Sequence, residues 1–238
     1  MESFAEDQKS VIVEQTVITQ THGRYLVVPT VGTDPAPMLV GFHGYAESAD
    51  TQLPRLRAIE SSEHWLVVSI QGLHRFYQRR TEEVVASWMT RQDRESAIND
   101  NLAYVSSVLD AVSAAWPTEP SIVYAGFSQG VAMAFRAAVN SNAQRIAVIA
   151  VGGDIPPEIE SGALARLSST LICRGSSEEW YTADKLAQDA RRLRESGVDV
   201  TALELPGGHQ WSADASQAAS GFLREWRLRD SVRRPDSP

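Results

Sequence analysis

Short apolar runs recur along the chain and are separated by longer amphipathic segments. Runs that are apolar at nearly every position are typical of strands buried on both faces of a sheet. Strands that alternate with helices in this way form a mostly parallel sheet with helices on both faces. The sequence therefore predicts an α/β fold. The expected strands are 38–42, 65–70, 121–126, 145–151, 170–175 and 199–205, and the expected helices are 50–60, 93–114, 129–141, 182–196 and 213–229.

Two further β-branched runs lie near the N-terminus, at residues 11–20 and 24–29. Their spacing indicates an antiparallel hairpin at one edge of the sheet. Since no repeat, linker or low-complexity tract follows, we expect residues 1–230 to form a single domain without a large cap domain. Residues 231–238 are polar and contain prolines, so we expect them to form a tail beyond the last helix.

The charge and the cysteine content exclude several classes of function. Twenty-two basic residues against thirty acidic ones give a formal net charge of −8, the wrong sign for neutralising phosphates along a nucleic acid. Cys173 is the only cysteine, so the chain can form no internal disulfide and no cysteine-based metal site. The histidines show no metal-binding spacing, and no glycine-rich loop leads into a phosphate-binding lysine. We therefore expect neither a metal ion nor a nucleic-acid partner.

The N-terminus and the distribution of apolar residues bear on location. The first residues, MESFAEDQKS, are polar and acidic, whereas a secretory signal begins with positive charge and an apolar run. No stretch approaches the roughly 20 apolar residues that span a bilayer. We therefore expect a cytoplasmic protein without a membrane span.

The motif GFSQG, residues 126–130, lies between an expected strand and an expected helix. A Gly-X-Ser-X-Gly motif in this position forms the nucleophile elbow, a sharp turn that lifts the serine hydroxyl above the sheet. The glycines leave room for the turn, because side chains there would collide with neighbouring backbone. Ser128 is therefore the candidate nucleophile, and the alternative is a structural turn with an unreactive serine.

A serine hydroxyl is a poor nucleophile at neutral pH and needs a base, which a third group orients. In this arrangement the acid and the histidine follow the serine along the chain in that order. His209, in the sequence PGGHQW, is the only histidine after Ser128 and is the candidate base. The acid should follow the fifth expected strand, where Glu178 is the first choice and Glu179 the second. Asp154, after the preceding strand, remains a third possibility.

An acyl carbonyl attacked by a serine becomes an oxyanion, which preorganised backbone N–H groups must stabilise. One donor is expected from Gln129, directly after the candidate nucleophile. The other is expected from Tyr45 in the loop HGYAES, which follows the first expected strand. His43 in the same loop is expected to brace it as a buried, hydrogen-bonded side chain.

Together these motifs resemble the phospholipase/carboxylesterase family of α/β-hydrolases, which includes acyl-protein thioesterases. The likeness rests on FHGYAES, the helical segment TRQDRESAINDNLAYV, GFSQG, RGSSEEW and GGHQW, and covers roughly residues 38–215. It implies a serine esterase without a cofactor. It assigns the nucleophile to Ser128, the base to His209 and the oxyanion donors to the amides of Tyr45 and Gln129.

Two positions depart from the pattern of that family. Glu178 stands where the family usually has aspartate, and Ala46 replaces the second glycine of its HGxG motif. With these residues we expect hydrolysis of a small carboxylic ester through a Ser-His-Glu triad and an acyl-enzyme. The alternatives are an acyl-protein thioesterase or lysophospholipase that prefers long acyl chains, and a noncatalytic small-molecule receptor on the same fold. The expected partner is a small-molecule ester, and the chain is expected to be a monomer or a homodimer.

The segment between the second strand and the long helix is the one roomy excursion at the carboxyl ends of the strands, where α/β folds bind ligands. Trp88 and Met89 in this segment are predicted to line a substrate pocket. Trp180 and Trp211 are predicted to do the same, because they are close in sequence to the acid and the base. Packing in the core is an equal alternative for each. The arginines of the segment either bind an anionic group of the substrate or pair with acidic neighbours at the surface.

Overall fold

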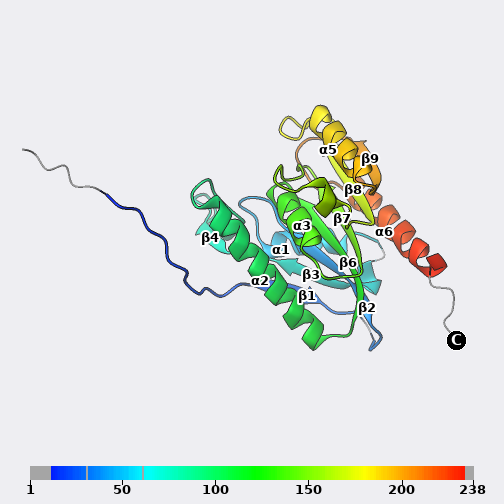
Figure 1. Cartoon of the computed structure of the whole chain (residues 1–238), viewed down its shortest axis with the longest axis horizontal. Helices are drawn as coiled ribbons and strands as arrows, with labels where there is room; N and C mark the ends of the chain where they lie inside the picture. Colours follow the sequence, from blue (N-terminus) through cyan, green and yellow to red (C-terminus); the bar gives the residue numbers. More distant parts are fainter. Residues whose placement is uncertain (1–11, 31, 61, 234–238) are drawn as a thin grey trace, which may run out of the picture.

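A computed structural model describes residues 12–30, 32–60 and 62–233. The central feature is a seven-stranded sheet in the order β1-β3-β2-β6-β7-β8-β9 (Figure 1), in which only the β1–β3 pair is antiparallel among the described residues. A separate antiparallel sheet contains β4 and β5. The α/β prediction is confirmed. The elements are β1 (Tyr25–Val28), β2 (Ala36–Phe42), α1 (Ala49–Arg57), η1 (Ser62–His64), β3 (Leu66–Ile70), β4 (His74–Tyr77), β5 (Val84–Ser87), α2 (Arg94–Ala115), β6 (Thr118–Phe127), α3 (Gln129–Val139), β7 (Arg145–Val151), α4 (Ser161–Leu164), β8 (Ser169–Gly175), α5 (Ala183–Glu195), β9 (Asp199–Leu205) and α6 (Ala213–Arg233).

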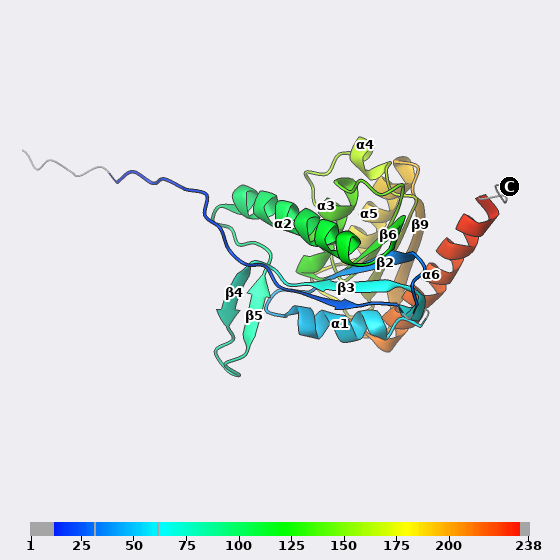
Figure 2. The same ribbon diagram turned by 90° about the horizontal axis from the view of Figure 1, so that it is seen from below.

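Helices cover both faces of the sheet, because the central strands are apolar on both sides. Along β2, Val40 and Phe42 pack in one core and Leu39 packs in the other. Side chains of α2, α3 and α5 complete the first core, and those of α1 and α6 complete the second. Figure 2 shows these two sets of helices on opposite sides of the sheet. Close packing on both faces holds the strand ends, and the loops that follow them, in fixed positions.

The predicted N-terminal hairpin does not form. Residues 12–20 are exposed and belong to no strand, and residue 11 lies outside the described part of the chain. The connection to β1 is instead held on α2, because the hydroxyl of Tyr104 donates to the carbonyl of Arg24 at 2.7 Å. The ring of Tyr104 also lies against Gly23, where a β-carbon would be only 1.9 Å away. The segment before β1 therefore runs beside α2 (Figure 2) and does not fold back on the edge of the sheet.

The last helix, α6, is longer than the sequence predicts. It continues to Arg233, although the predicted helix ends at residue 229. Charged residues are tolerated in a helix, and the first proline after this point is Pro235, so nothing before it stops the helix. Part of the expected C-terminal tail is therefore helical, and residues 234–238 lie outside the described part. No helix within the described ranges combines the length and the apolar character needed to cross a bilayer.

The hairpin of β4 and β5 projects from the main sheet beside the loop that follows β2 (Figure 2). Backbone hydrogen bonds join the two, because the amide of Ala86 donates to the carbonyl of Glu47 at 2.7 Å and the amide of Ala46 donates to the carbonyl of Ala86 at 3.1 Å. The hairpin therefore forms one wall of the region at the carboxyl ends of β2 and β6.

Candidate active site

Ser128 occupies the turn between β6 and α3. Its backbone angles are φ 53° and ψ −120°, and a positive φ is strained for a residue with a β-carbon. The flanking glycines provide space, since a β-carbon at Gly130 would lie 2.2 Å from the carbonyl oxygen of Phe42 and one at Gly126 would lie 2.4 Å from that of Gly130. The amide of Ser128 donates to the carbonyl of Val151 on β7 at 2.9 Å. These contacts fix the serine at the carboxyl end of the sheet.

His209 connects Ser128 to Glu178. Its Nε2 lies 2.8 Å from Oγ of Ser128, and its Nδ1 lies 2.5 Å from Oε2 of Glu178. The three residues follow β9, β6 and β8, whose parallel order brings their carboxyl ends to the same edge. With Glu178 ionised, Nδ1 carries the ring proton and Nε2 is free to accept the proton of the serine hydroxyl.

Glu178, and neither Glu179 nor Asp154, is the carboxylate that contacts the imidazole. Burial alone would raise the pKa of Glu178, but hydrogen bonds from His209 and from backbone amides of its own loop outweigh burial and hold that pKa below its ordinary value. Glu178 is therefore ionised at neutral pH. The side chain of Glu179 is exposed, and Asp154 instead pairs with Lys185 at 3.5 Å.

Gln129, one of the two expected oxyanion donors, begins α3. Backbone amides in the first turn of a helix have no acceptor within the helix, so they can bind an anion. Its side chain is fixed as well, because Nε2 donates to the carbonyl of Met89 at 3.1 Å and Oε1 accepts from the amide of Trp88 at 3.0 Å. The side chain thus joins α3 to the segment after β5.

Tyr45, the other expected donor, lies in the loop after β2, which packs against the elbow. A β-carbon at Gly44 would lie 3.1 Å from the ring of Phe127, the residue before the nucleophile. Ala46 has φ 57°, a left-handed conformation that glycine adopts at lower cost. The loop therefore holds a turn that glycine would favour, and Ala46 bears the strain.

An ion pair that the sequence analysis missed supports this loop. Arg55 on α1 donates to both carboxylate oxygens of Glu47, at 2.6 and 2.7 Å, and its guanidinium carbon lies 4.5 Å from the ring centre of Phe127. Glu47 also accepts from the amide of Gly44 at 2.8 Å. Burial alone would raise the pKa of Glu47, but Arg55 holds that pKa below its ordinary value. The spacing of Gly44 and Glu47 is a local signal for the hydrogen bond between them, whereas nothing in the sequence indicates that Arg55 takes part.

His43 lies buried beneath the same loop. Its Nε2 accepts from the amide of Gly72 at 3.0 Å, so Nδ1 carries the proton and donates to the carbonyl of Gly44 at 2.7 Å. Burial lowers the pKa of His43, and the neutral ring braces the loop.

Trp88 is fully buried, and its indole nitrogen donates to the carbonyl of His43 at 2.8 Å. Trp88 therefore packs in the core beneath the site, which corrects the prediction that it lines the substrate pocket.

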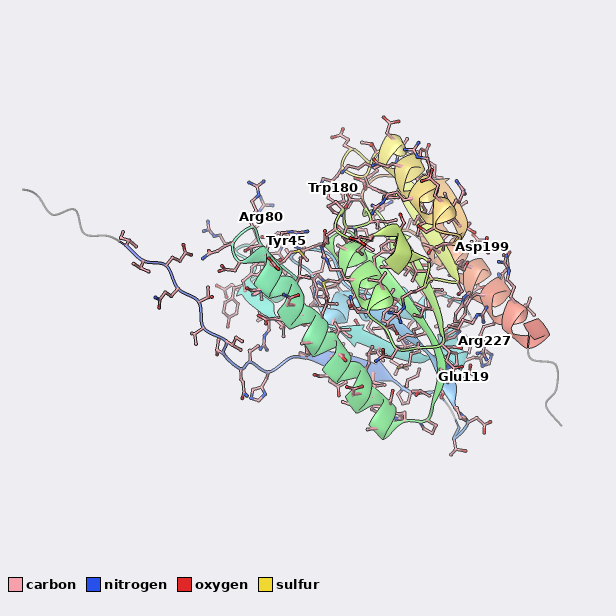
Figure 3. The ribbon with its side chains drawn as sticks, in the orientation of Figure 1. Tyr45, Arg80, Glu119, Trp180, Asp199 and Arg227 are labelled. Atoms are coloured by element: carbon pink, nitrogen blue, oxygen red, sulfur yellow. The ribbon has the colours of Figure 1, made fainter. Side chains whose placement is uncertain are left out.

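The other predicted pocket residues lie in different surroundings. Trp180 is 51% exposed, and its ring lies 6.2 Å from that of His209. Figure 3 shows Trp180 and Tyr45 at the same end of the molecule, on the loops that follow β8 and β2. Met89 is half-buried beside Gln129, and half-buried Trp211 packs against the core under α6. Of these side chains, Trp180 has the position best suited to contact a substrate.

Among the arginines of the hairpin segment, Arg75 donates to the carbonyl of His22 at 2.8 Å. Arg80 lies on the connection between β4 and β5 and is exposed (Figure 3), and Arg94 lies 3.7 Å from Glu158. Within residues 12–30, 32–60 and 62–233, no group of three or more His, Cys, Asp or Glu side chains could hold a metal ion.

A strained serine between a strand and a helix, with an acid and a histidine after it along the chain, is the arrangement of the α/β-hydrolase class. A sequence model of the phospholipase/carboxylesterase family matches residues 25–227, and the chain belongs to that family. This match confirms the resemblance drawn from the motifs. No curated protein sequence matches the chain.

Solved structures with the same fold include several esterases. The chain is similar to the carboxylesterase from Mesorhizobium loti, with a TM-score of 0.67 and 16% identity over 90% of this chain and 98% of that one. It is similar to the Bacillus cereus carboxylesterase, with a TM-score of 0.64 and 16% identity over 85% of this chain and 94% of that one. It is also similar to Zea mays acyl-protein thioesterase 2, with a TM-score of 0.63 and 18% identity over 86% of this chain and 99% of that one. At these identities the likeness shows the fold alone.

Proposed function

We propose that this protein is a serine hydrolase that cleaves small carboxylic esters through Ser128, His209 and Glu178. The hydrogen-bonded chain that joins these side chains, with contacts of 2.8 and 2.5 Å, carries the proposal. A buried, ionised carboxylate that orients a histidine toward a strained serine is the arrangement that makes a hydroxyl nucleophilic. Membership of the phospholipase/carboxylesterase family supports the same class of reaction.

In the acylation step, Oγ of Ser128 attacks the ester carbonyl while Nε2 of His209 accepts the hydroxyl proton. Glu178 stabilises the imidazolium that forms and remains ionised. The carbonyl oxygen becomes negatively charged and accepts hydrogen bonds from the amides of Tyr45 and Gln129. When the tetrahedral intermediate collapses, His209 donates its proton to the departing alcohol, and an acyl-serine remains.

In the deacylation step, a water molecule takes the place of the alcohol. His209 accepts a proton from this water as it attacks the acyl carbonyl, and the same amides stabilise the second oxyanion. Collapse returns the proton to Oγ of Ser128 and releases the carboxylic acid. The half-exposed ring of Trp180 lies beside His209, where it would contact the acyl group or the alcohol.

A second candidate substrate is a long-chain acyl ester or thioester. Apolar side chains continue from the oxyanion loop onto the hairpin, because the rings of Tyr45 and Phe76 lie 5.7 Å apart and both are exposed. An exposed aromatic pair beside a reactive centre favours contact with a long acyl chain. The acyl chain length that the enzyme prefers therefore distinguishes the two candidates.

The test is hydrolysis of p-nitrophenyl esters from acetate to palmitate by the wild type and by Ser128→Ala. We expect the fastest turnover with short chains and a loss of about 10⁴-fold or more in kcat in the variant. An optimum at long chains that disappears in Phe76→Ser would favour the second candidate. Wild-type turnover in Ser128→Ala would contradict the proposed mechanism for both candidates. A folded protein that turns over no ester would favour a receptor.

A further inference from the structure

The loop after β8 carries Glu178 and is bonded on one side to the loop that carries His209. The amide of Ser176 donates to the carbonyl of Leu205 at 2.7 Å, and that of Ser177 donates to the carbonyl of Gly207 at 2.8 Å. These bonds fix the start of the acid loop relative to the base. They do not fix the turn from residue 178 to residue 181, on which the carboxylate depends.

The carboxylate of Glu178 faces in two directions. Its Oε2 lies 2.5 Å from Nδ1 of His209, while its Oε1 accepts from the amide of Trp180 at 2.9 Å and contacts the amide of Tyr181 at 3.4 Å. The side chain therefore folds back onto its own turn before it reaches the imidazole. Any shift in this turn moves Oε2 relative to His209, because the same carboxylate is bound at both ends.

Arg174, near the end of β8, spans this turn from below. It is only 6% exposed. Its Nη2 donates to the carbonyl of Glu178 at 2.9 Å, and its Nε donates to the carbonyl of Tyr181 at 3.0 Å. Its Nη1 forms an ion pair with Glu204, the residue opposite it on β9. A planar guanidinium can satisfy all three partners at fixed angles, which an ammonium group cannot.

The other side of the turn is also anchored. The buried hydroxyl of Tyr181 donates to Oδ2 of Asp189 on α5 at 3.0 Å, and the amide of Ile155 donates to the same oxygen at 3.1 Å. Tyr181 is thus held at its side chain by α5 and at its carbonyl by Arg174. A buried guanidinium is costly unless its donors have acceptors. Arg174 therefore keeps the arrangement in which its three contacts form.

We infer that Arg174 is a positioning residue for the reaction, which holds the turn of the acid loop so that Glu178 can orient His209. The inference rests on the proposed function. It also accounts for how a glutamate, whose side chain is one methylene longer than that of aspartate, is held in one orientation. The longer side chain has more freedom, and the fixed turn, with its two amides on Oε1, removes that freedom.

The test compares Arg174→Lys with Arg166→Lys. Arg166 is the control because its guanidinium also donates to two backbone carbonyls, those of Val139 at the end of α3 and Ser141 in the loop after it, and not at the triad. A displacement of about 1 Å near the reacting groups can cost about 10²-fold in rate. For Arg174→Lys we expect kcat per active site to fall by about 10- to 100-fold with KM unchanged. Arg166→Lys should keep wild-type values.

Two further readouts separate positioning from simple loss of folded protein. In Arg174→Lys the acid limb of the kcat/KM profile should move to lower pH, because a displaced carboxylate stabilises the imidazolium less. The far-downfield proton resonance of the His209–Glu178 hydrogen bond, assigned by its loss in His209→Gln, should shift or broaden. Both should be unchanged in Arg166→Lys.

Unchanged kcat in Arg174→Lys, or a lower kcat with an unchanged acid limb and an unchanged resonance, would overturn the inference. If Arg174→Lys does not fold, Glu204→Gln keeps the guanidinium and removes its charged partner, and it should shift the same readouts in the same direction by less. If the wild type shows no turnover that depends on Ser128, the proposed function fails. The resonance still tests whether Arg174 positions Glu178.

Discussion

The loop after β8, which carries Glu178, is held by residues of the main sheet and α5, whereas the loop after β2, which carries Tyr45, is held by α1 and also bonded to the separate β4–β5 hairpin. On the acid side, buried Arg174 and Glu204 of the adjacent strand hold the turn. On the oxyanion side, backbone hydrogen bonds join Glu47 to Ala86 on the hairpin. Glu178 is buried, but Tyr45 is 61% exposed.

This difference indicates that the acid loop and the oxyanion loop have different roles. The acid and the base act on the serine in the same way whatever the substrate, so a rigid support within the sheet suits them. In the proposed function the oxyanion loop and the hairpin face the substrate, and the four residues of β4 are all exposed. Substitutions on the acid side should therefore change kcat, and substitutions on the hairpin should mainly change which ester is preferred.

The largest effect that would sharpen this comparison is expected for Glu178→Gln. The amide keeps the size of the side chain but favours the wrong tautomer of His209, so kcat should fall by about 10⁴-fold. The matched control is Glu179→Gln, whose side chain is exposed and should leave kcat unchanged. Steady-state kinetics on a short-chain ester would decide. Equal losses in the two variants would contradict the assignment of the acid.

A smaller effect is expected on the oxyanion side for Glu47→Ala. The substitution removes the acceptor for the amide of Gly44 and the partner of Arg55, so the loop that carries Tyr45 should lose its fixed position. We expect kcat to fall by about tenfold, less than the loss of an oxyanion donor itself. Asp50→Asn, which removes the carboxylate of an exposed ion pair with Arg24, is the control. Wild-type kcat in Glu47→Ala would show that the ion pair does not support the loop.

The smallest effect is expected in the acid dependence of stability. Because the folded-state pKa of Glu47 is held below its ordinary value, its carboxylate stabilises the fold above the ordinary pKa of about 4.3. That stabilisation is lost as the pH falls through the lower folded-state value. In Glu47→Gln the free energy of unfolding, measured by urea denaturation between neutral and acidic pH, should therefore fall less steeply with acid. A slope equal to that of the wild type would contradict this account.

Local patterns were sufficient to predict the alternation of strands and helices, and they singled out the motif that forms the turn at Ser128. The strand before the motif and the helix after it can both be read from neighbouring residues. The choice between Glu178 and Glu179 was open, because adjacent residues on a loop differ only in how the turn directs them. The turn directs Glu178 toward His209, which lies 31 residues further along the chain, so only the fold brings the two side chains together.

The predictions that proved wrong depended on contacts between distant parts of the chain. The position of Trp88 in its segment predicts a pocket residue, but its indole nitrogen donates to the carbonyl of His43 and its ring packs in the core. The β-branched run at 12–20 has the composition of a strand, but Tyr104 on α2 holds the connection that it would need for a hairpin. The Glu47–Arg55 pair, about which the sequence made no prediction, joins a loop to a helix without a local motif.

The measurement that tests the central claim most directly is labelling of the intact protein with a fluorophosphonate, followed by mass spectrometry of its peptides. A single adduct on Ser128 is predicted, formed much more slowly in His209→Gln and absent in Ser128→Ala, because only an activated serine attacks the reagent. An adduct on another residue, or no adduct on a folded wild-type protein, would contradict the claim that Ser128 is an activated nucleophile.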